Sequence, residues 1–597
     1  MVYVYEGPIK LRLSGSPVEV GAINDDLRYR TENYWRADSY QIWKRSGGKV
    51  GWDGYKRPIN RVRGSRTTWM SPRGWLDDIL NSAEKLNISV NLDNLIERPF
   101  GNLTADDLPD DLICADFALD GDQSYGICQW LSNGFGVVQA TVSAGKTAMF
   151  CGAYAYIKRK YPEMRALYLT PTERLVRQVT AESRKFLPDL EIGQYGGGKH
   201  EKDAKDLVVA TSAIIGRHMD ELSQSWLKSF GVLLCDESHH AAGATMQKIL
   251  ETVPAFFRFG ASDTTKEDNA EAFAIIKGLL GPIRHRVDVE PLINIGRVAR
   301  PSIYLVDVPT WQNKYAALKH TPETGSSAWL LHDGHWIETT YDGPSPLLDE
   351  EGNVRTHKVK VPVLDSDGNP AYRNGFPVKE EINEPLWNEG WHLLTDKNGK
   401  LYEAESRWCL LDRVYDQAII LNKDRNKLIA DWAASFSGQG KQTLVVCTRT
   451  LHILLLERLI KDRLNPDLVR ILFSVHASKE RDETFDWLRK TPGAVLITPL
   501  VKEGVSINEI KAGVVADHVV SYEVARQIIG RYIRKKKEGT NTAEIVWFID
   551  RQHPRLRHNS LKLFDELKRI RGYTFYHPCC NPGDLTLATR YEEVDAS

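Results

Sequence analysis

The sequence has no apolar run of the roughly 18 residues that a membrane-spanning helix requires. Its first residues, MVYVYEGPIK, lack the basic and apolar regions of a secretion signal. We therefore expect a soluble protein without membrane contact that is not exported. Its expected location is the cytoplasm, which would be the host cytoplasm if the protein is viral.

Cysteine is scarce and shows no paired spacing. The eight cysteines among 597 residues form no CxxC motif, and most lie in apolar segments such as 232-VLLCD-236. This pattern is typical of reduced packing residues rather than of a disulfide framework. Cys579 and Cys580 lie near His577, but adjacent cysteines suit a single metal ion poorly.

The chain also lacks an excess of charge of either sign. Its 78 Lys and Arg nearly balance 79 Asp and Glu, so no overall positive field indicates a polyanionic partner. No internal repeat, low-complexity tract or carboxylate–lysine cluster of a nuclease is evident. Any surface that binds a polyanion must therefore be local.

One local segment departs from this balance. Between Arg28 and Arg73, twelve basic residues occur with three acidic and eight aromatic ones. The basic residues are Arg28, Arg30, Arg36, Lys44, Arg45, Lys49, Lys56, Arg57, Arg61, Arg63, Arg66 and Arg73. This composition suits phosphate contacts and stacking on bases, with Arg61 and Arg63 as candidate contacts. Alternatively, the aromatic residues form the core of a small α+β domain.

The length predicts three or four domains. From 105 to 310, buried strands at 166–170, 207–211, 232–236 and 303–308 alternate with helix-like stretches, which indicates a parallel sheet covered by helices. Turn-rich sequence at 311–405 indicates an antiparallel, β-rich insertion. The alternation returns from 406, with strands at 443–448, 494–498 and 544–549.

A phosphate-binding loop is predicted at 140-ATVSAGKT-147. An apolar strand precedes it, and a helix beginning near Lys146 would direct its amides and its positive dipole end at phosphates. Lys146 would hold the β- and γ-phosphates, and the Thr147 hydroxyl would bind magnesium (Mg²⁺). Ser143, Ala144 and Gly145 complete the loop.

The segment 233-LLCDESHH-240 predicts a second part of the phosphate site. Its apolar strand ends in Asp236 and Glu237, at the edge where open α/β sheets bind ligands. Asp236 suits Mg²⁺ coordination, and Glu237 suits activation of the attacking water.

These two motifs together resemble those of the superfamily 2 helicases, and the resemblance covers about 115–550. It implies that Gln123 contacts adenine and that 169-LTPTERLVRQ-178 and 209-VATS-212 grip a nucleic-acid backbone. The candidate contacts in these two segments are Thr170, Pro171, Thr172, Thr211 and Ser212. The third motif resembles 261-ASDTT-265, in which Asp263 replaces the usual small residue.

The second α/β region carries the motifs that would complete a motor. The segment 525-ARQIIGRYIR-534 resembles the family's sixth motif, which implies catalytic roles for Gln527, Arg531 and Arg534 across the ATP cleft. The segments 443-TLVVCTRT-450 and 497-ITPLVKEGVSI-507 resemble motifs IV and V. This resemblance implies that Gly504 contacts the nucleotide. It also implies four contacts with nucleic acid, at Thr448, Arg449, Thr498 and Ser506.

The expected fold is therefore α/β, with two RecA-like parallel-sheet domains in tandem, at 105–310 and 406–597. The small α+β domain at 1–104 precedes them and would dock DNA, and the β-rich insertion at 311–405 separates them. The segments 51-GWDGYKR-57 and 74-GWLDDILNSAEKLN-87, together with 555-RLRHNSLKLFDELKRIRGY-573, are similar to phage helicases of the UvsW type.

That resemblance implies an ATP-dependent, Mg²⁺-dependent DNA helicase that remodels branched DNA in replication, recombination or repair. We expect a monomer whose partners are DNA and replication or recombination proteins. Three alternatives remain: a duplex-DNA translocase or restriction-type motor that does not unwind, an RNA helicase, and an ATP-gated nucleic-acid clamp. The sequence gives neither polarity nor preferred junction.

Overall fold

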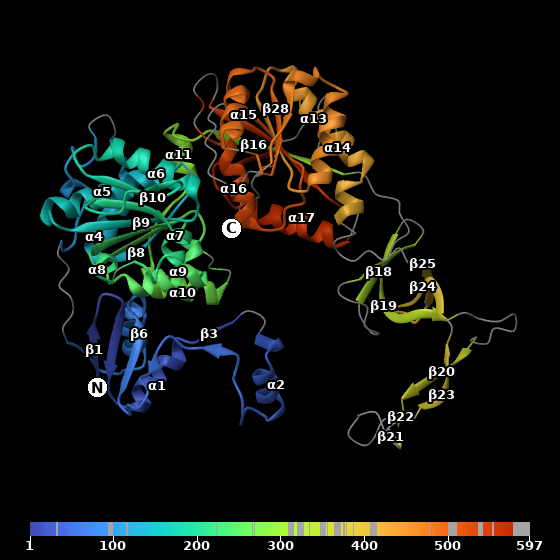
Figure 1. Cartoon of the computed structure of the whole chain (residues 1–597), viewed down its shortest axis with the longest axis horizontal. Coiled ribbons are helices and arrows are strands. Elements are labelled where there is room, and N and C mark those ends of the chain that lie inside the picture. Colours follow the sequence, from blue (N-terminus) through green and yellow to red (C-terminus); the bar gives the residue numbers. More distant parts are fainter. Residues whose placement is uncertain are drawn as a thin grey trace, which may run out of the picture.

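A computed structural model gives the fold (Figure 1). It describes the chain except for residues 32–33, 94–99, 115–117, 142, 223, 266, 268, 309–315, 319–326, 333–334, 347–353, 355, 363–371, 374–375, 378, 386, 406–414, 474, 477, 500–509, 535, 537–540, 552–553 and 577–597. In the described part, no helix is both long and apolar enough to cross a membrane.

The N-terminal region forms the expected α+β domain. Its sheet has the order β5-β6-β2-β1-β7, from β1 (Val2–Glu6), β2 (Lys10–Ser14), β5 (Asn60–Arg61), β6 (Thr68–Pro72) and β7 (Val90–Asp93). Alternate residues of β1 and β2 are buried, as expected for strands with one face on a core. Helices α1 (Pro17–Asp26) and α3 (Leu76–Lys85) supply Ile23 and Ile79 to this core.

A small lobe projects from this domain and contains β3 (Tyr29–Arg30), η1 (Tyr34–Arg36), α2 (Asp38–Arg45) and β4 (Tyr55–Lys56). The aromatic residues are divided between the core of the domain and its surface. Trp69 is buried in the core of the domain, whereas Trp35 in the lobe is 51% exposed. Tyr40 packs between Tyr34 and Trp43, with ring centroids 4.8 and 5.8 Å away.

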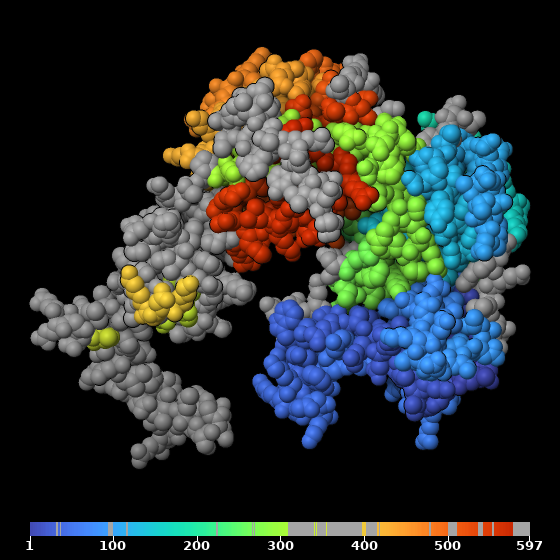
Figure 2. Space-filling model, turned by 180° about the vertical axis from the view of Figure 1, so that it is seen from behind, coloured from blue at the N-terminus to red at the C-terminus, as the bar shows by residue number. Residues whose placement is uncertain are grey.

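The N-terminal domain is docked on the first α/β domain (Figure 2). Buried Arg73 forms an ion pair with Glu6 at 2.8 Å and donates to the carbonyl of Phe256 at 2.7 Å. Phe100, which lies within the predicted N-terminal region, stacks instead on Phe257 of the first domain at 5.7 Å. The chain therefore enters the packing of the first domain before residue 104.

The first α/β domain has a sheet with the order β11-β10-β12-β9-β13-β14-β8-β15. The strands are β8 (Phe135–Ala140), β9 (Arg165–Thr170), β10 (Ile192–Gly196), β11 (Lys199–His200), β12 (Leu207–Thr211), β13 (Phe230–Asp236), β14 (Phe257–Ser262) and β15 (Ile283–Val287). All adjacent pairs are parallel except β10–β11. The central strands are buried throughout, because helices cover both faces.

The helices of this domain are α4 (Gly121–Asn133), α5 (Lys146–Lys160), α6 (Glu173–Phe186), α7 (Ser212–Arg217), α8 (Gln224–Lys228), α9 (Ala244–Thr252), α10 (Ala270–Leu280) and α11 (Val289–Asn294), with the short turns η3 (Ala105–Asp107) and η4 (Ser238–Ala242). Helices α5 and α6 pack on one face, while α7, α9 and α10 border a second core cluster. The N-terminal domain contacts α10.

The described part of 311–405 is β-rich and antiparallel, as predicted, but it interrupts the second α/β domain, since the strand before it belongs to the second sheet. Its larger sheet has the order β17-β18-β19-β24-β25, from β17 (Ala316–Leu318), β18 (Ser327–His332), β19 (His335–Pro346), β24 (Trp387–Asp396) and β25 (Leu401–Glu405). Two further hairpins pair β20 (Thr356–Pro362) with β23 (Lys379–Pro385) and β21 (Tyr372–Arg373) with β22 (Phe376–Pro377).

The second α/β domain has a wholly parallel sheet with the order β27-β28-β26-β29-β30-β16-β31. Its strands are β16 (Arg300–Asp307), β26 (Thr443–Val446), β27 (Val469–Ile471), β28 (Val495–Thr498), β29 (Ala512–Val515), β30 (Thr542–Ile549) and β31 (Thr574–Tyr576). Helices α13 (Lys423–Gly438), α14 (Thr450–Lys461), α15 (Ser478–Lys490), α16 (Tyr522–Tyr532) and α17 (Pro554–Leu567), with η5 (Asp416–Ile420) and η6 (Pro466–Leu468), complete it.

One strand belongs to a different sheet than its position predicts. Strand β16 covers the predicted strand at 303–308, which the sequence assigns to the first domain, yet it pairs with β30 and β31 of the second sheet. Its partners lie more than 230 residues away, so its local apolar pattern does not reveal this pairing. The first sheet ends at β15, and the fold is that of two RecA-like domains in tandem.

We expect Arg73→Ala to lower the free energy of unfolding by about 3–5 kcal/mol, because it removes the buried arginine that compensates the charge of Glu6 and that bonds to Phe256. The measurement is chemical denaturation followed by circular dichroism. Arg61→Ala is the control, since Arg61 is an exposed arginine of the same domain. A loss below about 1 kcal/mol for Arg73→Ala, the size typical of a surface pair, would contradict this account of the docking.

Candidate nucleotide site between the two domains

Three neighbouring strands of the first sheet carry the candidate nucleotide site. Strands β13, β14 and β8 lie side by side and run parallel, so their carboxyl ends meet at one edge. The phosphate-binding loop follows β8, Asp236 ends β13, and Ser262 ends β14. The fold thus brings together segments that lie about 90 to 120 residues apart in the sequence.

The loop after β8 has the backbone of a phosphate cradle. Ser143 and Gly145 have φ angles of 68° and 84°, and α5 begins at Lys146, as predicted. Gln123 donates from Nε2 to the carbonyl of Ala144 at 2.8 Å, and a Cβ on residue 145 would lie 2.1 Å from that nitrogen. Glycine is therefore required where the buried glutamine meets the loop.

Lys146 lies between the cradle and the acidic pair. Its Nζ is 3.7 Å from Oε1 of Glu237 and 3.5 Å from the carbonyl of Ala140. Burial would lower the pKa of Lys146, but the charges of Glu237 and Asp236 hold it above its ordinary value. The amine therefore stays charged, as a phosphate ligand must.

Asp236 and Glu237 differ in their environments. Burial and the neighbouring charge of Glu237 raise the pKa of Asp236. Burial would also raise the pKa of Glu237, but Lys146, His239 and Arg531 hold it below its ordinary value. Glu237, with a φ of 47°, is thus kept ionised.

The residues predicted to bind Mg²⁺ lie around one tyrosine. The hydroxyl of Tyr168, in β9, donates to Oδ2 of Asp236 at 3.4 Å and also contacts Thr147. A hydroxyl and a carboxylate are the hard oxygen donors that Mg²⁺ prefers, so these residues fit the ion. Tyr168 is buried and holds this arrangement.

The acidic motif is connected to the end of β14. Nδ1 of His239 lies 2.8 Å from Oγ of Ser262 and 3.5 Å from Oε2 of Glu237. The next residue, Asp263, accepts from Nη2 of Arg526 at 2.7 Å. This ion pair crosses from the first domain to helix α16 of the second.

Helix α16 places Arg531 opposite the acidic pair, and Arg534 follows just beyond the end of the helix. The helix packs closely on β29, because Gly513 leaves room for the ring of Tyr532, whose hydroxyl donates to the carbonyl of Leu444 at 3.1 Å. Burial lowers the pKa of Arg531, and the negative charge of Glu237 opposes that effect. Burial, together with the charge of Arg531, lowers the pKa of Arg534 to about 10. Gln527 is half-buried on the same helix.

The predicted backbone-gripping residues of the first domain lie at the ends of the adjacent strands β9 and β12. Their hydroxyls are already engaged: Thr170 Oγ1 lies 3.3 Å from the carbonyl of Thr172, and Thr172 and Thr211 cap α6 and α7. Pro171 and Ser212 lie at the same two junctions. These segments therefore offer helix-start amides rather than unoccupied threonine hydroxyls.

In the second domain, Thr448 and Arg449 are exposed after β26. Thr498 is different, because its side chain is buried and its hydroxyl donates to the carbonyl of Leu472 at 2.8 Å. Its expected contact with nucleic acid has no exposed group to make it. Gly504 and Ser506 lie outside the residues that the structure describes.

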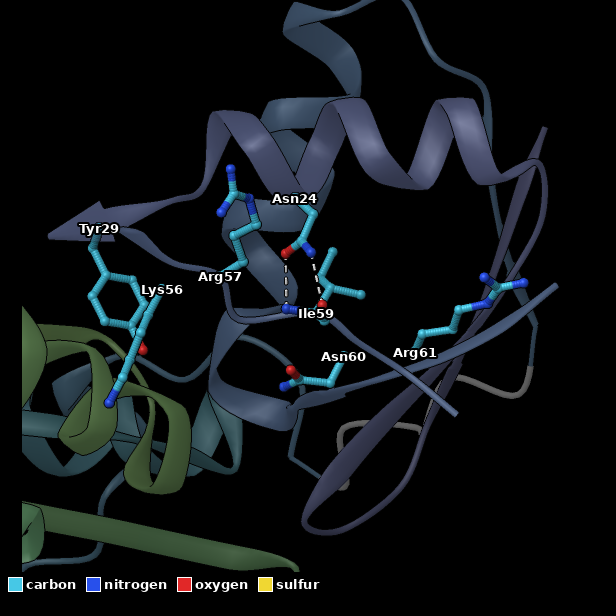
Figure 3. Close-up of a pocket in the computed structure, with 7 residues that line it drawn as sticks. All are labelled: Asn24, Tyr29, Lys56, Arg57, Ile59, Asn60 and Arg61. Carbon is cyan, nitrogen blue, oxygen red and sulfur yellow. Dashed lines mark hydrogen bonds between the residues drawn. The ribbon is translucent and has the colours of Figure 1, made fainter. Parts of the chain in front are cut away.

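Arg61 lines a polar pocket of about 490 Å³ in the N-terminal domain, with Tyr29, Lys56 and Arg57 (Figure 3). Lys56 pairs with Glu271 of the first domain at 2.5 Å, and Arg57 pairs with Asp25 and Asp53. These cations are largely neutralised. Arg61 and Arg63, both exposed, remain available as surface charges.

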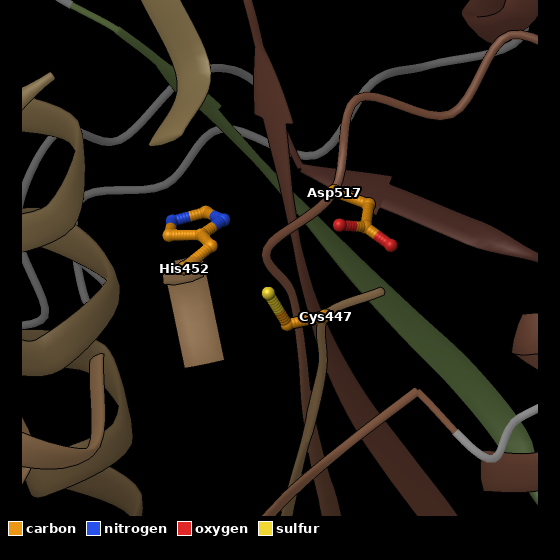
Figure 4. A group of neighbouring side chains, drawn as sticks. All are labelled: Cys447, His452 and Asp517. Atoms are coloured by element: carbon orange, nitrogen blue, oxygen red, sulfur yellow. The ribbon is translucent and has the colours of Figure 1, made fainter. Parts of the chain in front are cut away.

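A second cluster lies in the second domain, where Cys447, His452 and Asp517 place ligand atoms within 4.8 Å of one another (Figure 4). Asp517 accepts from the amide of Thr448 at 3.1 Å, and Nε2 of His452 lies 2.8 Å from Oδ1 of Asn426, whereas Nδ1 of His452 is buried without a hydrogen-bond partner among the described residues. Burial raises the pKa of the Cys447 thiol, which keeps it protonated. This cluster is therefore a buried packing arrangement beneath motif IV.

Comparisons with known proteins support the sequence resemblance. Residues 122–267 match the family described as type III restriction enzyme, res subunit. The ATP-dependent DNA helicase uvsW of Enterobacteria phage T4 is 25% identical over 189 residues, which cover 30% of this chain and 36% of that helicase. The family match thus covers the phosphate-binding loop and the acidic pair, and the chain is similar to that helicase over about a third of the helicase's length.

Two solved structures of low sequence identity align with most of this chain. The crystal structure of T4 UvsW aligns with 96% of this chain and 98% of its own, at 14% identity and a TM-score of 0.38. A fragment of a putative HsdR subunit of a type I restriction enzyme from Vibrio vulnificus aligns with 83% of this chain and 72% of its own, at 14% identity and a TM-score of 0.47.

Sequence reasoning missed Tyr168, Ser262 and Arg526. Tyr168 lies inside an apolar strand and Arg526 inside an amphipathic helix, so both resemble ordinary packing or surface residues. Asp263 carried the one usable signal, since a charged residue replaced a small one. Its partner could be found only once the two domains were placed together.

We expect Arg531→Ala to reduce ATP turnover by about 10³-fold or more while changing nucleotide affinity much less, because the arginine stabilises charge on the transferred phosphoryl group. Single-turnover hydrolysis and nucleotide titration measure the two effects separately. Arg551→Ala is the control, because Arg551 lies in the same domain and pairs with Asp307 on β16. Equal losses of turnover and affinity for Arg531→Ala would indicate ground-state binding instead.

Proposed function

We propose that this protein is an ATP-dependent DNA helicase or translocase that remodels branched DNA, as in fork regression or branch migration during replication, recombination or repair. The observation that supports it most is the convergence of the phosphate loop, the acidic pair and Arg531 of α16 where the two domains meet. The cytoplasm, or host cytoplasm, is the compartment in which such a protein would meet DNA.

The residues divide the work of hydrolysis. Lys146 and the α5 amides would hold the phosphates, with Mg²⁺ at Thr147 and Asp236 neutralising phosphate charge when bound. Glu237 would accept the proton of the attacking water, and Arg531 would stabilise charge on the phosphoryl group as it transfers. Opening and closing of the cleft would then move the strand ends of the two domains relative to each other.

The choice of branched DNA rests on the UvsW relationship and on the N-terminal domain. Its projecting lobe carries exposed Trp35 beside basic residues, a combination that suits base stacking and phosphate contacts. The match to a restriction-enzyme subunit favours a second candidate, a duplex-DNA translocase that does not unwind. A strand-displacement assay on forks, four-way junctions and RNA–DNA hybrids separates these functions and tests the RNA alternative.

We expect Lys146→Ala and Glu237→Gln to fail in different ways. Lys146→Ala should weaken nucleotide binding, because it removes the charge that holds the phosphates. Glu237→Gln should bind ATP but hydrolyse it about 10²- to 10⁴-fold more slowly, the usual contribution of a general base. DNA-stimulated ATPase and binding of a fluorescent ATP analogue measure both, and near-normal turnover in either variant would rule out the assignment.

We expect Arg61→Ala with Arg63→Ala to weaken binding to four-way junctions. The log–log salt slope should also fall by about one unit for each arginine–phosphate interaction that the substitutions remove. ATPase on single strands should change little, because the ATP motifs lie in other domains. Fluorescence anisotropy at several salt concentrations gives the slope. Arg12→Ala, an exposed arginine of the same domain outside 28–73, is the control. An unchanged slope would indicate that the basic residues are exposed to solvent and do not contact DNA phosphates.

A further inference from the structure

The end of β14 carries a buried carboxylate where related motifs have a small residue. Asp263 is 3% exposed, and its Oδ1 accepts from Nη2 of Arg526 at 2.7 Å. The two side chains are 4% and 17% exposed, so this is not a solvated surface pair. It links the first sheet directly to helix α16 of the second domain.

Each charge of this pair depends on the other. Burial raises the pKa of Asp263, and Arg526 and Lys146 oppose that effect. Burial would lower the pKa of Arg526, but Asp263 holds it above its ordinary value. Separating the domains would leave each group without the partner that compensates its burial, which is costly unless water enters.

The pair also completes a chain of side-chain contacts around the candidate phosphate site. Within the first domain, contacts run from Glu237 to His239 at 3.5 Å and from His239 to Ser262 at 2.8 Å. Asp263 then crosses to Arg526, one and a half helical turns before Arg531 on α16. The negative charge of Glu237 in turn acts on the guanidinium of Arg531.

We propose that Asp263 and Arg526 form an inter-domain clasp that closes the cleft and positions α16, and with it Arg531, against Glu237. Both are positioning residues, since neither needs to touch the nucleotide. The effect on hydrolysis rests on the proposed ATPase function, whereas closure of the cleft does not. The substitution of a small residue by aspartate thus adds a contact that couples the two domains.

The first test measures cleft closure without nucleotide. Donor and acceptor dyes are attached through unnatural amino acids at exposed Lys185 in α6 and Lys479 in α15. We expect Asp263→Asn and Arg526→Gln each to shift the population toward longer distances. The double variant should shift no further than the larger single shift, because both changes break the same contact.

The matched control is Asp307→Asn. Asp307 pairs with Arg551 at 2.6 Å, but both residues belong to the second domain, so the distance distribution should not change. Thermal unfolding of every variant shows whether the domains remain folded. If both single variants retain the wild-type distances, or if their shifts add in the double variant, the clasp is wrong. Additive shifts would instead indicate that Asp263 acts through the charge of Lys146 in its own domain and not through Arg526.

The second test measures ATP turnover in the same variants. We expect either single change to lower kcat by roughly tenfold, within the range expected for coupled neighbours, with a smaller change in KM. Asp263→Glu and Arg526→Lys, which keep the charges, should recover part of kcat. If the wild-type protein shows no ATPase activity, the proposed function is wrong. The distance measurement still tests whether the clasp holds the two domains together. Active wild-type protein with unchanged variants would overturn the catalytic role of the clasp alone.

Discussion

The parallel alignment of β13, β14 and β8 is the constraint on which the cleft depends. Because the three strands run in the same direction, their carboxyl ends place the acidic pair, Asp263 and the phosphate loop at one edge. An antiparallel neighbour would have sent one of these groups to the opposite edge. The direction of the strands therefore determines which segments meet at the site.

That convergence creates an electrostatic problem that one domain cannot solve. Asp236, Glu237 and Asp263 lie together at a largely buried edge, and their own motifs supply Lys146 as the opposing cation. Arg526 and Arg531 come from the second domain and face Asp263 and Glu237. Lys146 and His239 of the first domain compensate part of this charge, and Arg526 and Arg531 add to this compensation only when the two domains meet. Association of the domains and assembly of the site are the same physical event.

Local patterns predicted what local physics determines. The buried strands, the start of α5 at Lys146 and the β-rich insertion follow from apolar runs, turn residues and dipole-compatible loops. Pairing across long separations does not follow from such patterns. Strand β16 looks like its neighbours in sequence, and Arg526 looks like a solvated helix residue until Asp263 is placed opposite it. Likewise, Thr172 and Thr211 are residue types that often bind ligands. In the structure their hydroxyls instead accept hydrogen bonds from amides in the first turns of α6 and α7.

The membership of β16 in the second sheet also places the connection between the domains. Since β16 and η5 both belong to the second domain, the β-rich insertion leaves that domain and returns to it, and the crossing between domains is confined to the short segment after α11. There Val298 forms a bridge with Arg534, and the amide of Ala299 donates to the carbonyl of Ile533 at 2.6 Å. The crossing segment is thus bonded to the end of the arginine-bearing helix. A rotation of one domain relative to the other must act on α16 at two places, through this bridge just beyond its C-terminal end and through Arg526 within the helix.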